Sequence, residues 1–259
     1  MKETLKLIDE YRTPPAGTDH SAGLWAPELH CLRGRWYVYY AAANASRGNK
    51  SHRMYVLGGP PAGENPCQGE WEFLGRICGT PDQWAIDGTV FELSNVLYFV
   101  YSGWPLNNDN DSDLVQELFI VKLEDPITTR GAPVMICRPE HRWEFTRDGN
   151  GDHGINEGPQ FLSSPDGSWK GLVYSCAGSW TSEYKMATLE VTKGPPPPEQ
   201  LPNLAKTSMK SQLLIPDVAV HGRKSDGSTV VVQRFGAPGH DQRSDSRPVG
   251  SGSWKFPQL

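Results

Sequence analysis

The chain has 259 residues, of which Gly and Pro make up 49, and its aromatic residues include nine Trp. Turns must therefore be dense, and no long stretch shows clean helical periodicity, which excludes a mainly helical protein. The net charge is −5, divided into −9 over residues 1–190 and +4 over residues 191–259. An acidic main body argues against nucleic acid as a partner, because phosphate binding relies on clustered Lys and Arg.

Targeting signals are few. No apolar stretch is long enough to span a bilayer, so no membrane partner is predicted. Residues 1–9 lack the apolar core of a signal peptide, which favours a soluble, unsecreted chain. Three Asn-x-Ser/Thr triplets, the acceptors of N-glycosylation in secreted proteins, point weakly the other way. They begin at Asn44, Asn49 and Asn110.

The five Cys are odd in number and form no C-x-x-C pair, so they cannot all be joined in internal disulfides. Cys31, Cys137 and Cys176 stand in apolar strand contexts and are predicted to be buried free thiols.

The predicted elements begin with a short strand over 5–8 and a Pro/Gly loop. A unit then returns three times: an acidic residue beside Gly or Pro, a short strand, a turn and an aromatic-rich strand. The last aromatics of the three copies, Tyr40, Tyr101 and Tyr174, are 61 and 73 residues apart. This spacing suits one four-stranded propeller blade per unit, with blades over roughly 25–83, 84–153 and 154–190.

The C-terminal part begins with the proline run 194–198, which is interpreted as a stiff break because it offers no ladder donors. Strands over 218–220 and 228–233 are predicted to form a hairpin across the turn 223–227. Residues 241–259 show no periodicity and are predicted to be a disordered tail. The domain prediction is therefore a single propeller domain over 1–240 followed by this tail.

Carboxyl groups recur at the start of the repeated units. Burying ionised carboxylates is costly, so buried carboxylates at matching places in successive blades, converging on one axis, would need a functional reason. Asp87 stands in Trp84-Ala-Ile-Asp-Gly-Thr-Val-Phe91, and Glu157 in Asn156-Glu-Gly-Pro159. For both, the alternative is a solvated turn acid.

Other candidates lie close to these motifs in sequence. Trp25 and Glu28 belong to Trp25-Ala-Pro-Glu28, which also fits a structural Trp beside an edge proline. Trp104 and Trp180 each follow a strand and suit either sugar stacking or core packing. His240, in a tight turn, suits a ligand or metal contact or a structural role.

Taken together, these motifs resemble glycoside hydrolase family 43, the five-bladed propeller hydrolases of arabinose- and xylose-containing polysaccharides. The resemblance rests on Trp25-Ala-Pro-Glu-Leu-His30, Trp84-Ala-Ile-Asp-Gly-Thr-Val-Phe91, Asn156-Glu-Gly-Pro159 and Tyr174-Ser followed by Tyr184-Lys-Met, in the family's order. Arg53-Met-Tyr-Val-Leu57 is most similar to the branch of exo-acting α-L-arabinofuranosidases that trim α-1,5-linked arabinan. The implied fold is all-β.

By this resemblance, Glu157 is the general acid and Asp87 orients it and tunes its pKa. Trp25, Glu28, Trp84, Trp104 and His240 are the implied substrate-binding residues. The family inverts the anomeric centre, which requires an acid and a base about 6.5–9.5 Å apart. No cofactor is required, no metal ligand is predicted, and Ca²⁺ near the axis, beside His240, is left open. The family's location is extracellular, although no signal peptide is found in this chain.

The sequence departs from the family pattern at both ends. Only 24 residues precede Trp25, so most of the first blade, with its Asp-Pro base motif, is expected to be absent and the general base with it. After His240 the sequence does not continue as the family's closing strand. The expectation is an incomplete propeller of about three and a half to four blades, weakly active or inactive. The rival hypotheses are a β-xylosidase and a non-catalytic carbohydrate-binding propeller.

Overall fold

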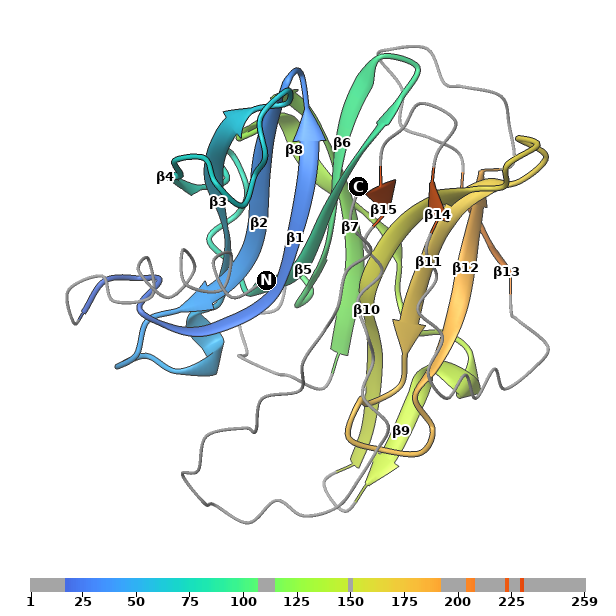
Figure 1. Ribbon diagram of the computed structural model, residues 1–259. Coiled ribbons are helices and arrows are strands. Elements are labelled where there is room, and N and C mark those ends of the chain that lie inside the picture. Colours follow the sequence, from blue (N-terminus) through green and yellow to red (C-terminus); the bar gives the residue numbers. More distant parts are fainter. Residues whose placement is uncertain are drawn as a thin grey trace.

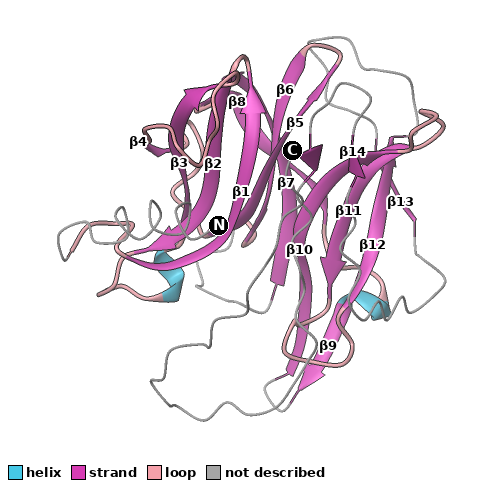
Figure 2. Cartoon of the chain, viewed as in Figure 1, coloured by secondary structure: helices cyan, strands magenta, loops and turns pink. Residues whose placement is uncertain are grey.

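The structure is a computed structural model that describes residues 17–106, 115–148, 151–191, 204–207, 222–223 and 229–230. It is built of strands, with two one-turn 3₁₀ helices, η1 (Asn49–Ser51) and η2 (Arg142–Glu144), in the described part (Figure 2). The predicted strand over 5–8, His240 and the predicted tail lie outside the described residues. No helix in the described part is long and apolar enough to cross a membrane.

Three groups of four antiparallel strands stand side by side (Figure 1); the first is a separate sheet, and the second and third are joined, together with β9, into one nine-stranded sheet. Each group is called a sheet below. The first contains β1 (Ala22–Leu32), β2 (Arg35–Ala43), β3 (Arg53–Pro61) and β4 (Glu72–Arg76). The second contains β5 (Ala85–Leu93), β6 (Val96–Gly103), β7 (Val115–Asp125) and β8 (Thr128–Cys137). The third contains β10 (Gly151–Ser163), β11 (Lys170–Cys176), β12 (Lys185–Val191) and β13 (Leu204–Thr207).

Two short pairings complete the described part. β9 (Phe145–Asp148) runs antiparallel to the start of β10, and β14 (Gly222–Arg223) pairs with β15 (Thr229–Val230). The second and third sheets are also linked through a short parallel pairing of β7 with β10. The pairing of β14 with β15 lies close to the predicted hairpin, with residues 229–230 inside its second predicted strand. Its first predicted strand, 218–220, lies outside the described residues.

Each sheet is a meander whose strands pair in chain order, as in a propeller blade. The repeat frame predicted from Tyr40, Tyr101 and Tyr174 is confirmed, because all three lie on the second strand of their sheets. The C-terminal limit of the third blade, which the sequence left open beyond residue 190, includes β13, because β13 pairs with β12. The proline run 194–198 stands between these two strands in the sequence and lies outside the described residues.

β13 is anchored to the third blade by a buried ion pair. The Lys206 ammonium lies 2.8 Å from the Glu144 carboxylate, which is fully buried and also accepts hydrogen bonds from Asn156 and Tyr174. Burial alone would raise the pKa of Glu144, but backbone N–H groups and Lys206 hold it below its usual range. A buried charge with this many partners fixes the strand in place.

Side chains that alternate along β6 join the blades to one another. Phe99 and Tyr101 point toward the first blade and pack in one cluster with Tyr39 and Val56. Tyr98 and Val100 point the other way, into a second cluster with residues of β11 and β12. The middle blade is therefore bound to both neighbours by fully buried aromatic and aliphatic side chains.

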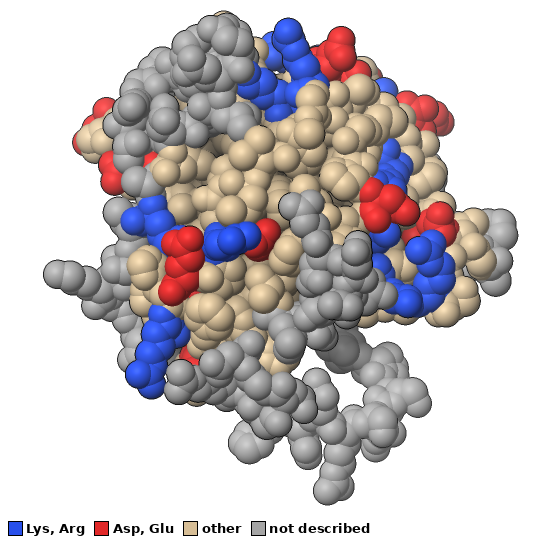
Figure 3. All heavy atoms as spheres, turned by 180° about the vertical axis from the view of Figure 1, so that it is seen from behind, with Lys and Arg blue, Asp and Glu red and all other residues tan. Residues whose placement is uncertain are grey.

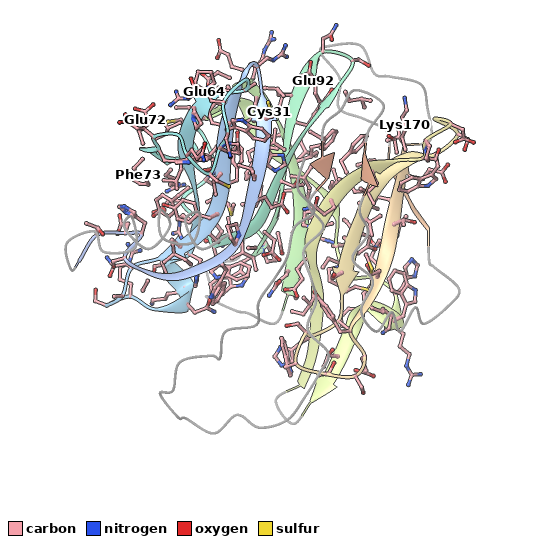
Figure 4. All side chains as sticks on the ribbon, viewed as in Figure 1. Cys31, Glu64, Glu72, Phe73, Glu92 and Lys170 are labelled. Atoms are coloured by element: carbon pink, nitrogen blue, oxygen red, sulfur yellow. The ribbon has the colours of Figure 1, made fainter. Side chains whose placement is uncertain are left out.

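The cysteine prediction is confirmed in part. Cys137 and Cys176 are buried and free, whereas Cys31 is exposed. Its strand, β1, alternates between half-buried and exposed residues, and Cys31 falls on the open face (Figure 4). Acidic and basic side chains are mixed over the face seen in Figure 3.

Candidate active site

The first strand of each blade carries a bulge at the same position. In β1, β5 and β10, one extra residue is inserted opposite the strand that carries Tyr40, Tyr101 or Tyr174. The four bulge residues are Trp25–Glu28, Ile86–Thr89 and Glu157–Gln160. Bulges bend a strand and re-aim its side chains, and they are frequent near active sites.

The second bulge residue has a left-handed backbone in all three blades. The φ angles are 44° at Ala26, 53° at Asp87 and 59° at Gly158. Such angles are unfavourable for Ala and tolerated by Asp, whereas Gly adopts them freely. The same local geometry is thus retained by three different residue types.

The acidic residues occupy different positions of this shared bulge. Glu157 is the first bulge residue, Asp87 the second and Glu28 the fourth. The prediction that the carboxylates stand at matching places was therefore wrong. They come together nevertheless, because β5 packs against both β1 and β10.

Asp87 is held by the neighbouring blade. Its Oδ2 accepts a hydrogen bond from the backbone N–H of Gly158 at 3.0 Å. Burial raises the pKa of Asp87 to about 6, the Gly158 hydrogen bond opposes this rise, and the charge of Glu28 adds to it. Asp87 is thus a carboxyl group that ionises just below neutral pH.

Glu157 has the more strongly perturbed carboxyl group. Burial, together with the nearby Asp87 carboxylate, raises the pKa of Glu157 to about 8, and a hydrogen bond with Tyr184 partly opposes the rise. Both pKa values are raised, that of Glu157 further than that of Asp87, so Asp87 loses its proton before Glu157 as the pH rises. Two carboxyl groups with separated pKa values are the arrangement expected of an acid and the group that tunes it.

Glu28 lies beside this pair but is engaged by other side chains. Its Oε1 accepts a hydrogen bond from the Gln160 side-chain amide, and its Oε2 lies 3.0 Å from Nε2 of His30. Its side chain is 15% exposed. Both oxygens of Glu28 are therefore engaged by protein groups, and its predicted contact with a substrate remains a prediction.

Trp25 presents an open aromatic face on β1, close in sequence to Glu28. It is 42% exposed and stacks on His52 with ring centroids 3.7 Å apart. His52 is buried, and its two ring nitrogens lie 2.8–2.9 Å from the backbone carbonyl oxygens of Asn49 and Gly23. Because its support is rigid, the Trp25 indole is suited to stack on a flat apolar ligand face.

Trp84 and Trp104 are 3% exposed and stack on each other at 5.1 Å. The Trp84 indole N–H donates to Asn49 Oδ1, which ties the start of β5 to η1. Both indoles therefore pack as core in this structure, and their predicted role as sugar contacts stays a prediction. Trp180 is 53% exposed and meets His153 edge-on.

Metal ligands do not cluster in the described part of the chain: no group of three or more His, Cys, Asp or Glu side chains is placed to hold an ion. His240, beside which Ca²⁺ was left open, lies outside the described residues.

Three contributors to the site were not assigned from the sequence: the Gly158 N–H, the Gln160 amide and the Tyr184 hydroxyl. Tyr184 belongs to a motif that was noticed but given no role, and the Asn-Glu-Gly-Pro motif ends one residue before Gln160. Neither the Gly158 backbone donor nor the Gln160 contact, which spans 132 residues, has a signal in a single sequence.

A propeller that gathers paired carboxyl groups of raised pKa has the architecture of a glycoside hydrolase. The sequence comparison is specific: the chain belongs to glycosyl hydrolases family 43, whose profile matches residues 4–216. The predicted fold, an incomplete five-bladed propeller, agrees with its structural neighbours.

Two curated relatives illustrate the similarity. An extracellular exo-alpha-(1->5)-L-arabinofuranosidase of Streptomyces avermitilis is 32% identical over 167 residues, which are 62% of this chain and 32% of that protein. Alpha-L-arabinofuranosidase 43 of Humicola insolens is 37% identical over 143 residues, which are 55% of this chain and 27% of that protein. The chain thus spans about a third of the length of these relatives.

Solved structures of arabinose-active enzymes are also similar to this chain. The alpha-L-arabinofuranosidase from Lactobacillus brevis superposes with a TM-score of 0.61 at 27% identity, covering 83% of this chain and 66% of that one. An endo-arabinase from Bacteroides thetaiotaomicron, with a TM-score of 0.58 and 15% identity, shares the fold.

Proposed function

We propose that this protein is an arabinofuranosidase-type glycoside hydrolase that removes terminal α-L-arabinofuranosyl residues from arabinan-type plant polysaccharides or oligosaccharides. The observation that carries the proposal is the contact between β5 and β10, where Gly158 holds Asp87 beside Glu157 and the two carboxyl groups differ in pKa. The names of the curated relatives and of the Lactobacillus brevis structure support arabinofuranose as the sugar. By the same analogy, the proposed location is extracellular.

In the proposed reaction, Glu157 donates its proton to the glycosidic oxygen as the bond to the anomeric carbon breaks. The Asp87 carboxylate keeps that proton on Glu157 until the leaving oxygen develops negative charge, and orients the acid through the Gly158 bulge. A water attacks the anomeric carbon from the opposite face of the sugar, so the configuration inverts; its proton goes to a general base or, where the base is absent, to solvent water. Trp25 provides an apolar ring for the sugar face.

A second part of this proposal concerns the general base, the group that activates the attacking water. Residues 1–24 contain no Asp-Pro motif of the kind that the family carries upstream of Trp-Ala-Pro-Glu. We propose that the 259-residue polypeptide is weakly active or inactive, because general base catalysis typically contributes about 10²–10⁴-fold.

The test is hydrolysis of p-nitrophenyl α-L-arabinofuranoside and of α-1,5-arabino-oligosaccharide by the 259-residue chain. Glu157→Gln should abolish any turnover of the oligosaccharide, whose alkoxide leaving group needs the proton, and should affect the aryl glycoside less. Glu64→Gln is the matched control, because Glu64 lies at the outside of the first blade (Figure 4). Rapid turnover of the oligosaccharide that survives Glu157→Gln would contradict the assignment of the acid.

The same assay separates the rival functions. Preferential cleavage of p-nitrophenyl β-D-xyloside would indicate a xylosidase. Binding of arabino-oligosaccharide measured by calorimetry, with no cleavage of the aryl glycoside even when azide is added as an external nucleophile in place of the missing general base, would indicate a carbohydrate-binding propeller.

A further inference from the structure

The four bulge residues of β10 organise three carboxyl groups from three blades. Glu157 contributes its own carboxyl group. The next residue, Gly158, donates its N–H to Asp87, which lies 71 positions away in sequence. Gln160, two residues further on, donates its side-chain amide to Glu28, 132 positions away.

Glu28 is fixed from two sides. Gln160 of β10 engages one carboxylate oxygen, and His30, on the same strand as Glu28, engages the other at 3.0 Å. His30 is itself set edge-on against the buried Tyr39 ring of β2, with centroids 5.5 Å apart. The side chains of Glu28 and His30 are 15% and 17% exposed, so water screens them little.

Glu28 and Glu157 both act on Asp87, which stands on the strand between them. The negative charge of Glu28 disfavours ionisation of Asp87, and ionised Asp87 in turn disfavours ionisation of Glu157. In the described part of the chain, Glu28 contacts His30 from β1 and Gln160 from β10. Asp87 of β5 also interacts with Glu157 of β10 and with Tyr184.

We propose that Glu28, held by Gln160 and His30, is a positioning residue that keeps a negative charge close to Asp87 and so helps to keep Asp87 protonated to a higher pH. The inference rests on the proposed function for the roles of Asp87 and Glu157. It assigns Glu28 to the acid–base machinery, where it acts through Asp87. The hydrogen bond from the Gln160 amide keeps the carboxylate of Glu28 in place.

The test separates charge from shape with two variants. Glu28→Gln has the size of the native side chain but no charge, whereas Glu28→Asp keeps the charge on a shorter side chain. Asp87 is titrated by ¹³C NMR in the full chain labelled at the Asp and Glu carboxyl carbons. Its signal is assigned by its loss in Asp87→Asn, and Glu64→Gln is the remote control.

We expect Glu28→Gln to lower the titration midpoint of Asp87 by about half a pH unit or more, and Glu28→Asp to leave it within about 0.2 units of the native value. The opposite result, a shift in Glu28→Asp with none in Glu28→Gln, would assign Glu28 a packing role and overturn the proposal. Unchanged midpoints in both variants would overturn it as well.

The titration needs no turnover, so it stands apart from the test of the proposed function. Where hydrolysis is measurable, the acidic limb of the kcat/KM profile should move to lower pH in Glu28→Gln, while the alkaline limb set by Glu157 moves less. Absence of hydrolysis in the native chain agrees with the weak activity or inactivity proposed for the 259-residue polypeptide, whereas rapid oligosaccharide turnover that survives Glu157→Gln would count against the proposed roles; neither result changes the titration.

Discussion

At the scale of single residues, Asp87 and Glu157 illustrate how one contact can serve chemistry at a cost to stability. Both carboxyl groups have pKa values above their usual range because they are buried near one another. A carboxyl group with a raised pKa favours folding while it is protonated. That contribution is present below its unfolded pKa and is lost as the pH rises through the folded pKa.

Glu157→Gln tests whether the stability of the protein falls with rising pH as this argument requires. The loss for Glu157 spans the window from its ordinary pKa of 4.5 to about 8. We therefore expect Glu157→Gln to change Tm little at pH 4 and to raise it at pH 8, since Gln cannot ionise. Thermal unfolding at the two pH values measures the difference, and an equal Tm change at both would show that Glu157 titrates normally.

Sequence reasoning identified Glu157 and Asp87 because each stands in a motif with Gly beside it. It could not predict that Gln160 holds Glu28, because that contact joins residues 132 positions apart. It also placed the three acidic residues at matching positions of the blades. A single sequence shows that each stands beside Gly or Pro, but it does not show which residue of the neighbouring strand each one pairs with. The register, and with it the bulge position of each residue, is a tertiary property.

At the scale of elements, the bulge in β1, β5 and β10 is the structural feature that recurs in the first strand of each blade. Its second residue must adopt a positive φ, and in β1 that residue is Ala26, at 44°. An L-residue other than Gly is strained there by roughly 1–2 kcal/mol. The first blade thus retains the bulge at a cost that the third blade avoids through Gly158.

Ala26→Gly should therefore stabilise the chain by about 0.5–1 kcal/mol, the relief of strain exceeding the added entropy of the unfolded chain. Ala41→Gly is the control, because Ala41 is the cross-strand partner of Trp25 and is not among the residues with positive φ. That change should destabilise by roughly the same amount. Urea unfolding of both variants measures the two effects, and destabilisation in Ala26→Gly would show that the bulge is not strained.

The element boundaries were predictable where turn residues mark them and not elsewhere. The aromatic strands were found from their composition. β13 was missed because a proline run usually ends an element, and here it stands before a strand that Lys206 and Glu144 bind to its blade. The exposure of Cys31 was missed because an apolar neighbourhood in sequence does not tell which face of a strand is open.

At the scale of the whole molecule, the middle blade shares one buried cluster with each neighbour. Phe99 is fully buried between the first and second blades, close enough to Gly88 that a Cβ there would overlap its ring. The core is thus continuous across the blades, which favours a single unfolding transition.

Phe99→Ala should lower the free energy of unfolding by about 3–5 kcal/mol through the cavity it leaves. The first and third blades should still lose structure together, as followed by Trp fluorescence and far-UV circular dichroism. Two separated transitions would show that the blades unfold independently.

The hydrogen bonds made by the β10 bulge also bear on how the protein folds. Glu28 and Asp87 are synthesised well before Gly158 and Gln160, and loops of 132 and 71 residues must close before either contact forms. Distant contacts of this kind are made slowly. During refolding, the raised pKa of Glu157 should therefore appear only after the first blade has regained its strands. Titration of this one carboxyl group would then report when the β10 bulge makes its contacts with the first and second blades.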